Sequence, residues 1–337
     1  MNPSASVKKD RVTTGFLFNS RRFIRQVLLA AMALPMLAIA QSAYPTKPIK
    51  IVVPFGAGSG PDITARLWAE RLARSYGQPV VIDNKPGAST IIGAQAVATA
   101  PADGYTLLYT VNNTTSINPS LYKTLPYKVE DFVAVSQIVS VPYVLIVPAD
   151  SPFRTLQDLV NTAKSRPNQL NYASYGIGQG THVAMAWFLN ATGATMTHVP
   201  YRDGGAADVM AGRITASFDS AATAIPLIQS GKLRALAVSG TRRVQALSSV
   251  PTVAETVPGF VGDSWHGLLA PKGTPQAVID KLSASLREVV ATEEFRRRVT
   301  DVGLVPVGST PAEFAKFLVD DAQAWGKVVT VNNIRAE

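Results

Sequence analysis

The chain has 337 residues, 47% of them hydrophobic, so it is long enough for two domains with substantial cores. It contains no cysteine, which excludes disulfide bonds and thiolate metal sites. The formal net charge is +9 at pH 7, but residues 1–40 hold six Lys or Arg and one Asp, a net of +5, so only +4 remains beyond them. That small remainder does not favour a nucleic-acid partner.

The first 40 residues have the composition of an export signal. Basic side chains precede an apolar run over residues 27–40, which ends in the cleavage pattern Ala38-Ile39-Ala40. The run is too short to cross a bilayer comfortably. We therefore expect a secretory signal that is removed near Ala40 and an exported mature protein, with an uncleaved anchor as the alternative.

A β-branched run at residues 49–54 leads into a glycine-rich turn, and Pro61 then opens an amphipathic stretch to about residue 76. This order predicts a strand, a loop and a helix whose first-turn N–H groups suit an anion. We expect Asp62 to accept some of these donors itself. The turn does not match two nucleotide-binding motifs. Pro61 stands where the dinucleotide-binding fingerprint has its third glycine, and the glycines are not followed by the Lys of a phosphate-binding loop. A tight turn without a ligand is the alternative.

The alternation of apolar runs and helical patterns continues along the chain. Further strands are expected at residues 79–84, 105–110, 133–139, 143–147, 170–174, 198–201, 214–218, 234–239 and 265–271, with helices near 89–99 and 206–211 and from about 155, 274 and 310. This order predicts parallel βα units with ligands beyond the carboxyl ends of the strands. Asn112 follows one such strand, where ordinary turn chemistry is the alternative explanation.

A second glycine-rich turn, residues 174–182, follows a short strand and opens an apolar helix. Two strand–glycine loop–helix units, each heading its own α/β run, predict two lobes that face each other across a cleft. Apolar residues at helical spacing from Phe314 to Trp325 predict a core-facing terminal helix that packs on the first lobe.

Enzymatic and metal chemistry have little support in the sequence. None of the three histidines lies in a metal-binding spacing. A Ser–His–Asp site built from Ser59 or Ser174 with His182 and Asp219 can be imagined, and an exported serine hydrolase is therefore one alternative. Our expectation is a protein with no catalytic residues, no metal and no cofactor.

Separate blocks along the mature chain, in the same order, carry a resemblance to a known family. They include Pro54-Phe55-x-x-Gly58 with Asp62, Asn84-Lys85-Pro86-Gly87-Ala88, Ala102-Asp103-Gly104-Tyr105, Gly176-x-Gly178-x-x-x-His182 and Val199-Pro200-Tyr201-Arg202. The chain resembles the periplasmic solute-binding proteins of tripartite tricarboxylate transporters, called the Bug family. The resemblance implies an α/β, two-lobed type II binding-protein fold, in which two hinge crossings join two βα domains around a ligand cleft. Lobe 1 would comprise residues 41–141 and 264–337, and lobe 2 residues 142–263.

The resemblance also implies a site. Members of the family hold a small carboxylate between the lobes, largely through backbone N–H groups of the two glycine loops and bridging waters, and deliver it to membrane subunits. The positions implied here, together with strand-end and loop positions, are Phe55, Ala57, Gly58, Ser59, Gly60, Asp62, Asn112, Ser174, Tyr175, Gly176, Gly178, Gly180, Thr181, His182 and Asp219.

Several departures from the family pattern concern specificity. Tyr175 stands where a proline or small residue is frequent, so it would narrow the pocket or stack on an aromatic cargo. Ser89-Thr90 follows Gly87-Ala88 where further glycine is frequent. Asp219 would contact a ligand hydroxyl or amine, or cap a helix. We expect a monomeric receptor for a di- or tricarboxylate, an aromatic carboxylate or an amino acid, with a ligand sensor for a signalling partner as the alternative.

Overall fold

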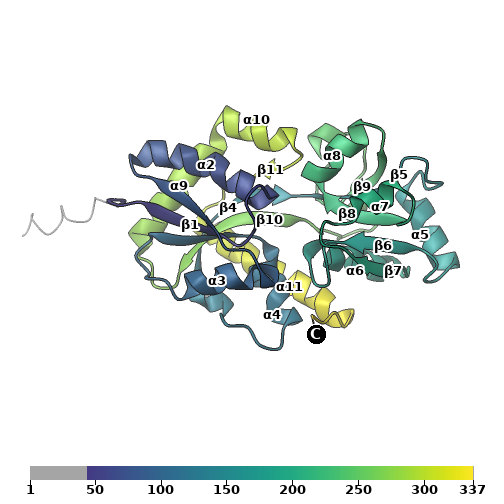
Figure 1. The fold of residues 1–337 in the computed structure, drawn as a ribbon, viewed down its shortest axis with the longest axis horizontal. Coiled ribbons are helices and arrows are strands. Elements are labelled where there is room, and N and C mark those ends of the chain that lie inside the picture. The colour runs from purple at the N-terminus through teal and green to yellow at the C-terminus, as the bar shows by residue number, and fades with distance from the viewer. Residues whose placement is uncertain (1–43, 337) are drawn as a thin grey trace, which may run out of the picture. The chain divides into compact units, whose positions relative to one another are not determined.

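The computed structural model describes residues 44–336, and its main compact unit begins at Lys47. Two β-sheets, each accompanied by helices, make up this unit (Figure 1). Across residues 44–336, no helix is both long and apolar enough to span a membrane. The predicted export signal at residues 1–40 lies outside the described residues.

The first sheet has six strands in the order β11-β4-β10-β3-β1-β2. They are β1 (Ile49–Val53), β2 (Val80–Asn84), β3 (Thr106–Thr110), β4 (Phe132–Val141), β10 (Ser264–Pro271) and β11 (Val305–Pro306). β1 pairs in parallel with β2 and β3, whereas β10 runs antiparallel to β3 and β4, and β11 runs antiparallel to β4. The expectation of parallel βα units is therefore wrong for β10 and β11, which run opposite to the other four strands, because an antiparallel strand needs no crossover helix and β10 enters the sheet from a loop. It is also wrong for β5 (Tyr143–Pro148) of the second sheet, which runs antiparallel to both of its neighbours.

The second sheet has five strands in the order β7-β6-β8-β5-β9. They are β5 (Tyr143–Pro148), β6 (Asn171–Ser174), β7 (Thr197–Pro200), β8 (Ala216–Ser220) and β9 (Leu233–Val238). The chain enters this sheet between Val141 and Tyr143 and rejoins the first sheet at Ser264. The crossings were expected near these positions, while their action as hinges and the lobe boundaries stay predictions.

Helices connect most of the strands. They are α2 (Gly60–Tyr76), α3 (Ile91–Ala98), α4 (Asn118–Leu121), α5 (Leu156–Ser165), α6 (Gly180–Thr192), α7 (Ala206–Met210), α8 (Ala221–Gln229), α9 (Gln276–Ala291), α10 (Glu293–Asp301) and α11 (Pro311–Val331). Capping boxes begin α5, at Thr155 and Asp158, and α11, at Thr310 and Glu313. The sequence pattern does not predict α8, because Pro226 interrupts it.

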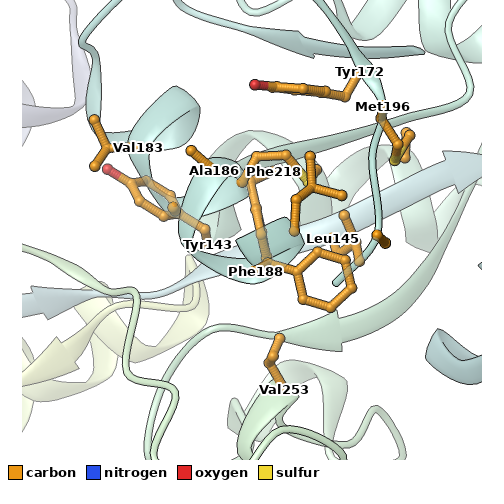
Figure 2. Close-up of a cluster of buried hydrophobic side chains, with 14 of the residues drawn as sticks. Tyr143, Leu145, Tyr172, Val183, Ala186, Phe188, Met196, Phe218 and Val253 are labelled. Atoms are coloured by element: carbon orange, nitrogen blue, oxygen red, sulfur yellow. The ribbon is translucent and has the colours of Figure 1, made fainter. Parts of the chain in front are cut away.

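The larger hydrophobic core lies around the second sheet, and Figure 2 shows part of it. Tyr143 of β5 and Phe218 of β8 belong to this core with Val183 and Phe188 of α6, all of them buried. The rings of Phe188 and Phe218 meet edge to face with centroids 6.3 Å apart. This packing fixes the orientation of α6, and with it the direction in which the N-terminus of α6 points.

The last helix, α11, contributes to the cores of both sheets. Near its start, Phe314 packs edge to face on Trp265 of the first sheet, as the sequence predicts. Near its end, Trp325 lies in the core of the second sheet, with its ring centroid 5.9 Å from that of Trp187 in α6. The prediction that this helix packs on the first lobe is therefore incomplete, because its apolar stripe is long enough to reach both cores.

Candidate functional site

Both glycine loops connect the carboxyl end of a strand to the N-terminus of a helix. Residues 54–59 join β1 to α2, and residues 175–179 join β6 to α6. In α/β sheets, this edge is where ligands bind, because helix N-termini and loop amides converge there. The two loops nevertheless differ in how they are held.

Asp62 organises the first glycine loop. Its Oδ2 accepts hydrogen bonds from the Gly58 amide at 2.8 Å and from Arg66 Nε at 3.0 Å, and its Oδ1 accepts one from Asn84 Nδ2 at 2.9 Å. Burial alone would raise the pKa of Asp62, but the hydrogen bonds from Arg66, Gly58 and Asn84 outweigh it and hold the pKa below its ordinary value. Ser59 caps α2 by accepting from the Asp62 amide. As predicted, Asp62 accepts a hydrogen bond from one of the backbone N–H groups of the loop.

The remainder of the first loop is open to solvent. Gly56, Ala57, Gly58 and Gly60 are exposed, and a Cβ atom at Gly58 would meet no atom within 4 Å. The Phe55 carbonyl accepts a hydrogen bond from Asn84 Nδ2 at 3.0 Å, which ties the start of the loop to β2. Of the predicted first-loop residues, Ala57, Gly58 and Gly60 are therefore exposed, whereas Phe55 and Ser59 are half-buried and Asp62 is buried.

The second glycine loop is closely packed. A Cβ atom at Gly178 would lie 2.2 Å from Leu121 Cδ2, and one at Gly180 would lie 2.3 Å from the Tyr143 hydroxyl oxygen. Gly178 also has a φ of +73°, which disfavours any residue with a side chain. The Tyr175 amide donates to Thr181 Oγ1 at 3.2 Å and so fixes the entry to α6. Close approach by neighbouring side chains, and not only turn geometry, explains the glycines.

The N-terminus of α6 has no side-chain cap, because Gln179 makes no capping hydrogen bond. Asn112 lies beside this end, with its Nδ2 3.6 Å from the ideal Cβ position of Gly180. It is fully buried, and its Oδ1 accepts a hydrogen bond from Ser264 Oγ at 3.0 Å, but its Nδ2 has no partner in the described protein. A buried donor without a partner costs about 1–3 kcal/mol. Beside the positive end of a helix, such a donor is suited to an anionic acceptor.

The serine hydrolase alternative does not match the side-chain geometry. Ser174 Oγ lies 2.7 Å from Nε2 of His198, not of His182. His182 accepts a hydrogen bond from the Gly178 amide on Nδ1 and stacks on His198 with centroids 3.9 Å apart. Burial lowers the pKa of His182 to about 3 and that of His198 to about 4, so both are neutral at pH 7. Asp219 orients neither ring among the described residues, since its Oδ1 bonds to other groups.

Asp219, at the end of β8, is buried, and one of its two carboxylate oxygens accepts three hydrogen bonds. Its Oδ1 accepts from the Tyr175 hydroxyl at 2.9 Å, from Thr223 Oγ1 at 2.7 Å and from the Ser220 amide at 2.7 Å. Burial raises the pKa of Asp219 above its ordinary value, although the hydrogen bonds from Thr223 and Tyr175 oppose this. Two of the three donors lie at the start of α8, but neither is a backbone N–H of its first turn, and α8 has no side-chain cap. Both predicted roles of Asp219 therefore stay predictions.

Hydrogen bonds through Ser89 and Gln179 link the second glycine loop to the segment between β2 and α3. The sequence did not predict this role for either residue. Asn113 Nδ2 donates to the Gly178 carbonyl at 3.2 Å and to Ser89 Oγ at 3.0 Å, and Gln179 Nε2 donates to Ser89 Oγ at 3.1 Å. Residues 88–90 all have positive φ without being glycine, at 46°, 50° and 78°. Such strain persists where surrounding contacts over-determine the backbone, often at binding sites. The departure from glycine at Ser89 was the one available signal in the sequence.

Elsewhere in the described chain, buried polar atoms without a partner also occur at Trp68, Tyr109, His266 and Ser283, none of which lies in a glycine loop. Between residues 44 and 336, no three His, Asp or Glu side chains are grouped to hold a metal ion. A surface hollow of about 840 Å³ lies at the far end of β5 from Tyr143, with Pro148, Asp158 and Arg166 in its wall. Its wall contains none of the predicted site residues, so its size does not make it the better candidate.

Two mixed sheets joined by two chain crossings, with a glycine loop before a helix N-terminus in each, define the class of periplasmic binding proteins. The comparisons identify the family within this class. The family model described as "Tripartite tricarboxylate transporter family receptor" matches residues 64–334, so the chain belongs to that family. The family consists of solute receptors, and the chain is a receptor and not an enzyme.

Related proteins match the sequence and fold of this chain over nearly its whole length. BugT from Bordetella pertussis is 35% identical over 308 residues, which is 90% of this chain and 94% of BugT. The structure of R. palustris Rpa4515 with adipate has 34% identity and a TM-score of 0.78, covering 86% of this chain and 99% of that one. The periplasmic binding protein BugD has 32% identity and a TM-score of 0.74, covering 87% and 100%.

Proposed function

We propose that this chain is a periplasmic receptor that captures a small organic carboxylate between its two glycine loops. The observation that carries the proposal is the uncapped N-terminus of α6 beside the unpartnered, fully buried Nδ2 of Asn112. Both features call for an anionic acceptor. The relative Rpa4515, whose structure contains adipate, supports a carboxylate as that acceptor.

The electrostatics of the second loop favour such a ligand. First-turn N–H groups of α6, the Tyr143 hydroxyl and Asn112 Nδ2 would surround a carboxylate placed there. Each hydrogen bond to a charged acceptor contributes about 1.5–3 kcal/mol, and the helix dipole adds about 0.3–1 kcal/mol. No arginine is needed, because oriented dipoles supply the positive potential.

Binding would stabilise one arrangement of the two lobes. A ligand that touches both loops favours the arrangement in which Asn113 and Gln179 reach Gly178 and Ser89. We infer that membrane subunits of a tripartite tricarboxylate-type transporter distinguish this loaded form from the empty one. The receptor acts as a monomer, after removal of a signal peptide near Ala40.

A thermal-shift screen of residues 41–337 tests the proposal. A ligand at about 100 times its dissociation constant adds about 2.7 kcal/mol to the unfolding free energy, which is visible as a higher melting temperature. We expect at least one mono-, di- or tricarboxylate to give such a shift. Shifts with sugars or cations, but with no carboxylate, would contradict the proposal.

A further inference from the structure

Asp263 lies where the chain returns from the second sheet to the first, directly before β10. Its Oδ2 accepts a hydrogen bond from Ser140 Oγ at 2.9 Å, and its Oδ1 accepts one from Ser239 Oγ at 2.5 Å. Ser140 belongs to β4 of the first sheet, whereas Ser239 directly follows β9 of the second sheet. One carboxylate therefore joins strand ends from both sheets.

The same carboxylate is connected to the start of β5. Ser239 Oγ accepts a hydrogen bond from the Tyr143 amide at 2.8 Å, so its single proton is directed to Asp263. Tyr143 and Ser140 lie on opposite sides of the first crossing, and Asp263 lies in the second. A rearrangement of the two sheets carries Ser140 with one sheet and Ser239 with the other, so it would strain or break one of the two hydrogen bonds of Asp263.

The surroundings of Asp263 disfavour its charged form. The residue is half-buried, and a Cβ atom at Gly240 would lie only 2.8 Å from its Oδ2. Burial raises its pKa to about 6 against the two serine hydroxyls, and no Lys, Arg or His of the described residues is among the groups that shift it. The titratable side chain on which Asp263 acts is Tyr143 of β5, whose own pKa is raised by burial and by nearby carboxylates, so that hydroxyl stays protonated.

We propose that Asp263 is a proton-sensitive latch between the two crossings: its protonated form favours the lobe arrangement that binds the carboxylate ligand, so the receptor binds more tightly at mildly acidic pH. The inference rests on the proposed carboxylate receptor and adds its regulation by pH. A protonated Asp263 can donate to Ser140 Oγ and still accept from Ser239, so both hydrogen bonds survive without a buried charge.

The direction of the effect follows from the pKa of Asp263 in two arrangements of the lobes. In the described arrangement, where Gln179 reaches Ser89, burial holds this pKa at about 6. An arrangement with the sheets moved apart gives the half-buried carboxylate more water and returns its pKa towards the ordinary value of 3.8. The described arrangement therefore binds the proton more strongly, and a ligand that favours this arrangement binds more tightly as the pH falls through about 6.

Calorimetric titration of the wild type and Asp263→Asn at pH 5 and pH 7 tests the latch. The probe is whichever of succinate, adipate, citrate and benzoate gives the largest thermal shift. Ionisation of the probe is the same for both chains, so the ratio of their affinities reports on Asp263. From pH 7 to pH 5, we expect this ratio to move about three- to tenfold in favour of the wild type, and about tenfold is the limit set by pKa values of about 6 and 3.8.

Proton uptake is a readout that a purely structural role would not move. At pH 6, titrations in two buffers of different ionisation enthalpy should show that the wild type takes up about half a proton more per ligand than Asp263→Asn. Ser140→Ala removes a donor that favours the charged carboxylate, so the midpoint of the pH dependence should move to a higher pH. This variant also decides the question if Asp263→Asn does not fold.

Asp321→Asn is the matched control. Burial raises the pKa of Asp321 to about 6 as well, but its hydrogen-bond donors all lie outside residues 142–263 and are Ser116, Trp265 and Trp325. The affinity of this variant should therefore keep the pH dependence of the wild type.

A ratio that stays constant or moves the other way, or a pH dependence that Asp321→Asn removes as well, would overturn the inference while the carboxylate site stands. A wild-type chain in which no carboxylate gives a thermal shift at either pH would instead remove the proposed function itself.

Discussion

The two glycine loops have similar sequences but are stabilised by different partners. In the first loop, Asp62 holds Gly58, Arg66 and Asn84 by hydrogen bonds, and the glycines face solvent. In the second loop, Gly178 packs on Leu121, a residue far away in the sequence. The first loop is thus preorganised by its own helix and by Asn84 of the neighbouring strand β2, whereas the shape of the second depends on contacts made across the protein. A ligand that needs both loops couples binding to those contacts.

The strongest test of this comparison is one substitution made at two glycines. Gly178→Ala and Gly58→Ala both place a side chain at positive φ, +73° and +81°, but only the first brings a Cβ atom 2.2 Å from Leu121. Strain and overpacking together should weaken carboxylate binding about 100-fold for Gly178→Ala, or about 2.7 kcal/mol. Gly58→Ala should cost about tenfold or less, measured by calorimetry. Equal losses would mean that the second loop is not held by the contact with Leu121.

A second test removes the internal support of the first loop. Asp62→Ala leaves the Arg66 and Asn84 side chains without their shared acceptor, so we expect a loss of about 2–3 kcal/mol in unfolding free energy from urea denaturation. Asp320→Ala is the control, since Asp320 forms a similar i,i+4 pair with Lys316 but is exposed, and it should change stability by under about 1 kcal/mol. Equal effects would show that the Asp62 network is only a surface pair.

A third test uses pH at the crossing between the sheets. Burial raises the pKa of Asp263 to about 6, although Ser239 and Ser140 donate to it. Because the pKa of Asp263 is higher in the folded chain than its ordinary value of 3.8, its protonated form stabilises the fold. This contribution is complete at pH values below 3.8 and is lost as the pH rises through about 6. Asp263→Asn does not titrate, so its stability relative to wild type should increase by on the order of 2 kcal/mol between pH 4 and pH 7. A difference that stays constant with pH in denaturation curves would contradict the assignment.

The smallest effect is expected at Ser89. Ser89→Ala removes the acceptor shared by Asn113 Nδ2 and Gln179 Nε2, so carboxylate affinity should fall about three- to tenfold. Thr99→Ala, at an exposed hydroxyl that bonds only within its own helix region, is the control and should leave affinity unchanged. Unaltered affinity in Ser89→Ala would mean that these bonds do not contribute to the bound arrangement.

The comparison also explains how much could be predicted from the sequence. Two partners of Asp62, Gly58 and Arg66, lie four residues from it, so a first-turn carboxylate after a glycine turn was enough to predict that Asp62 would satisfy loop donors. The third partner, Asn84, lies 22 residues away on β2 and was not predicted. Strand and helix positions were predictable for the same reason, since periodicity and capping residues such as Thr155 act locally.

The second loop could not be predicted in this way. Its neighbours come from α4, β5 and the segment around Ser89, and only tertiary packing brings them together. The pairing of Ser174 with His198, and not His182, likewise follows from strand register, because β6 and β7 lie side by side in parallel. The antiparallel entry of β10 has no local signal at all.

The central claim is that a carboxylate binds at the N-terminus of α6 beside Asn112. Asn112→Asp keeps the acceptor for Ser264 but replaces the unpartnered donor by a negative charge. The most direct measurement is calorimetric titration of this variant and the wild type with the strongest carboxylate from the thermal-shift screen, with circular dichroism as the check on folding. We predict a loss of at least about 100-fold in affinity with the fold retained. A folded variant that binds the carboxylate as tightly as the wild type would contradict the account.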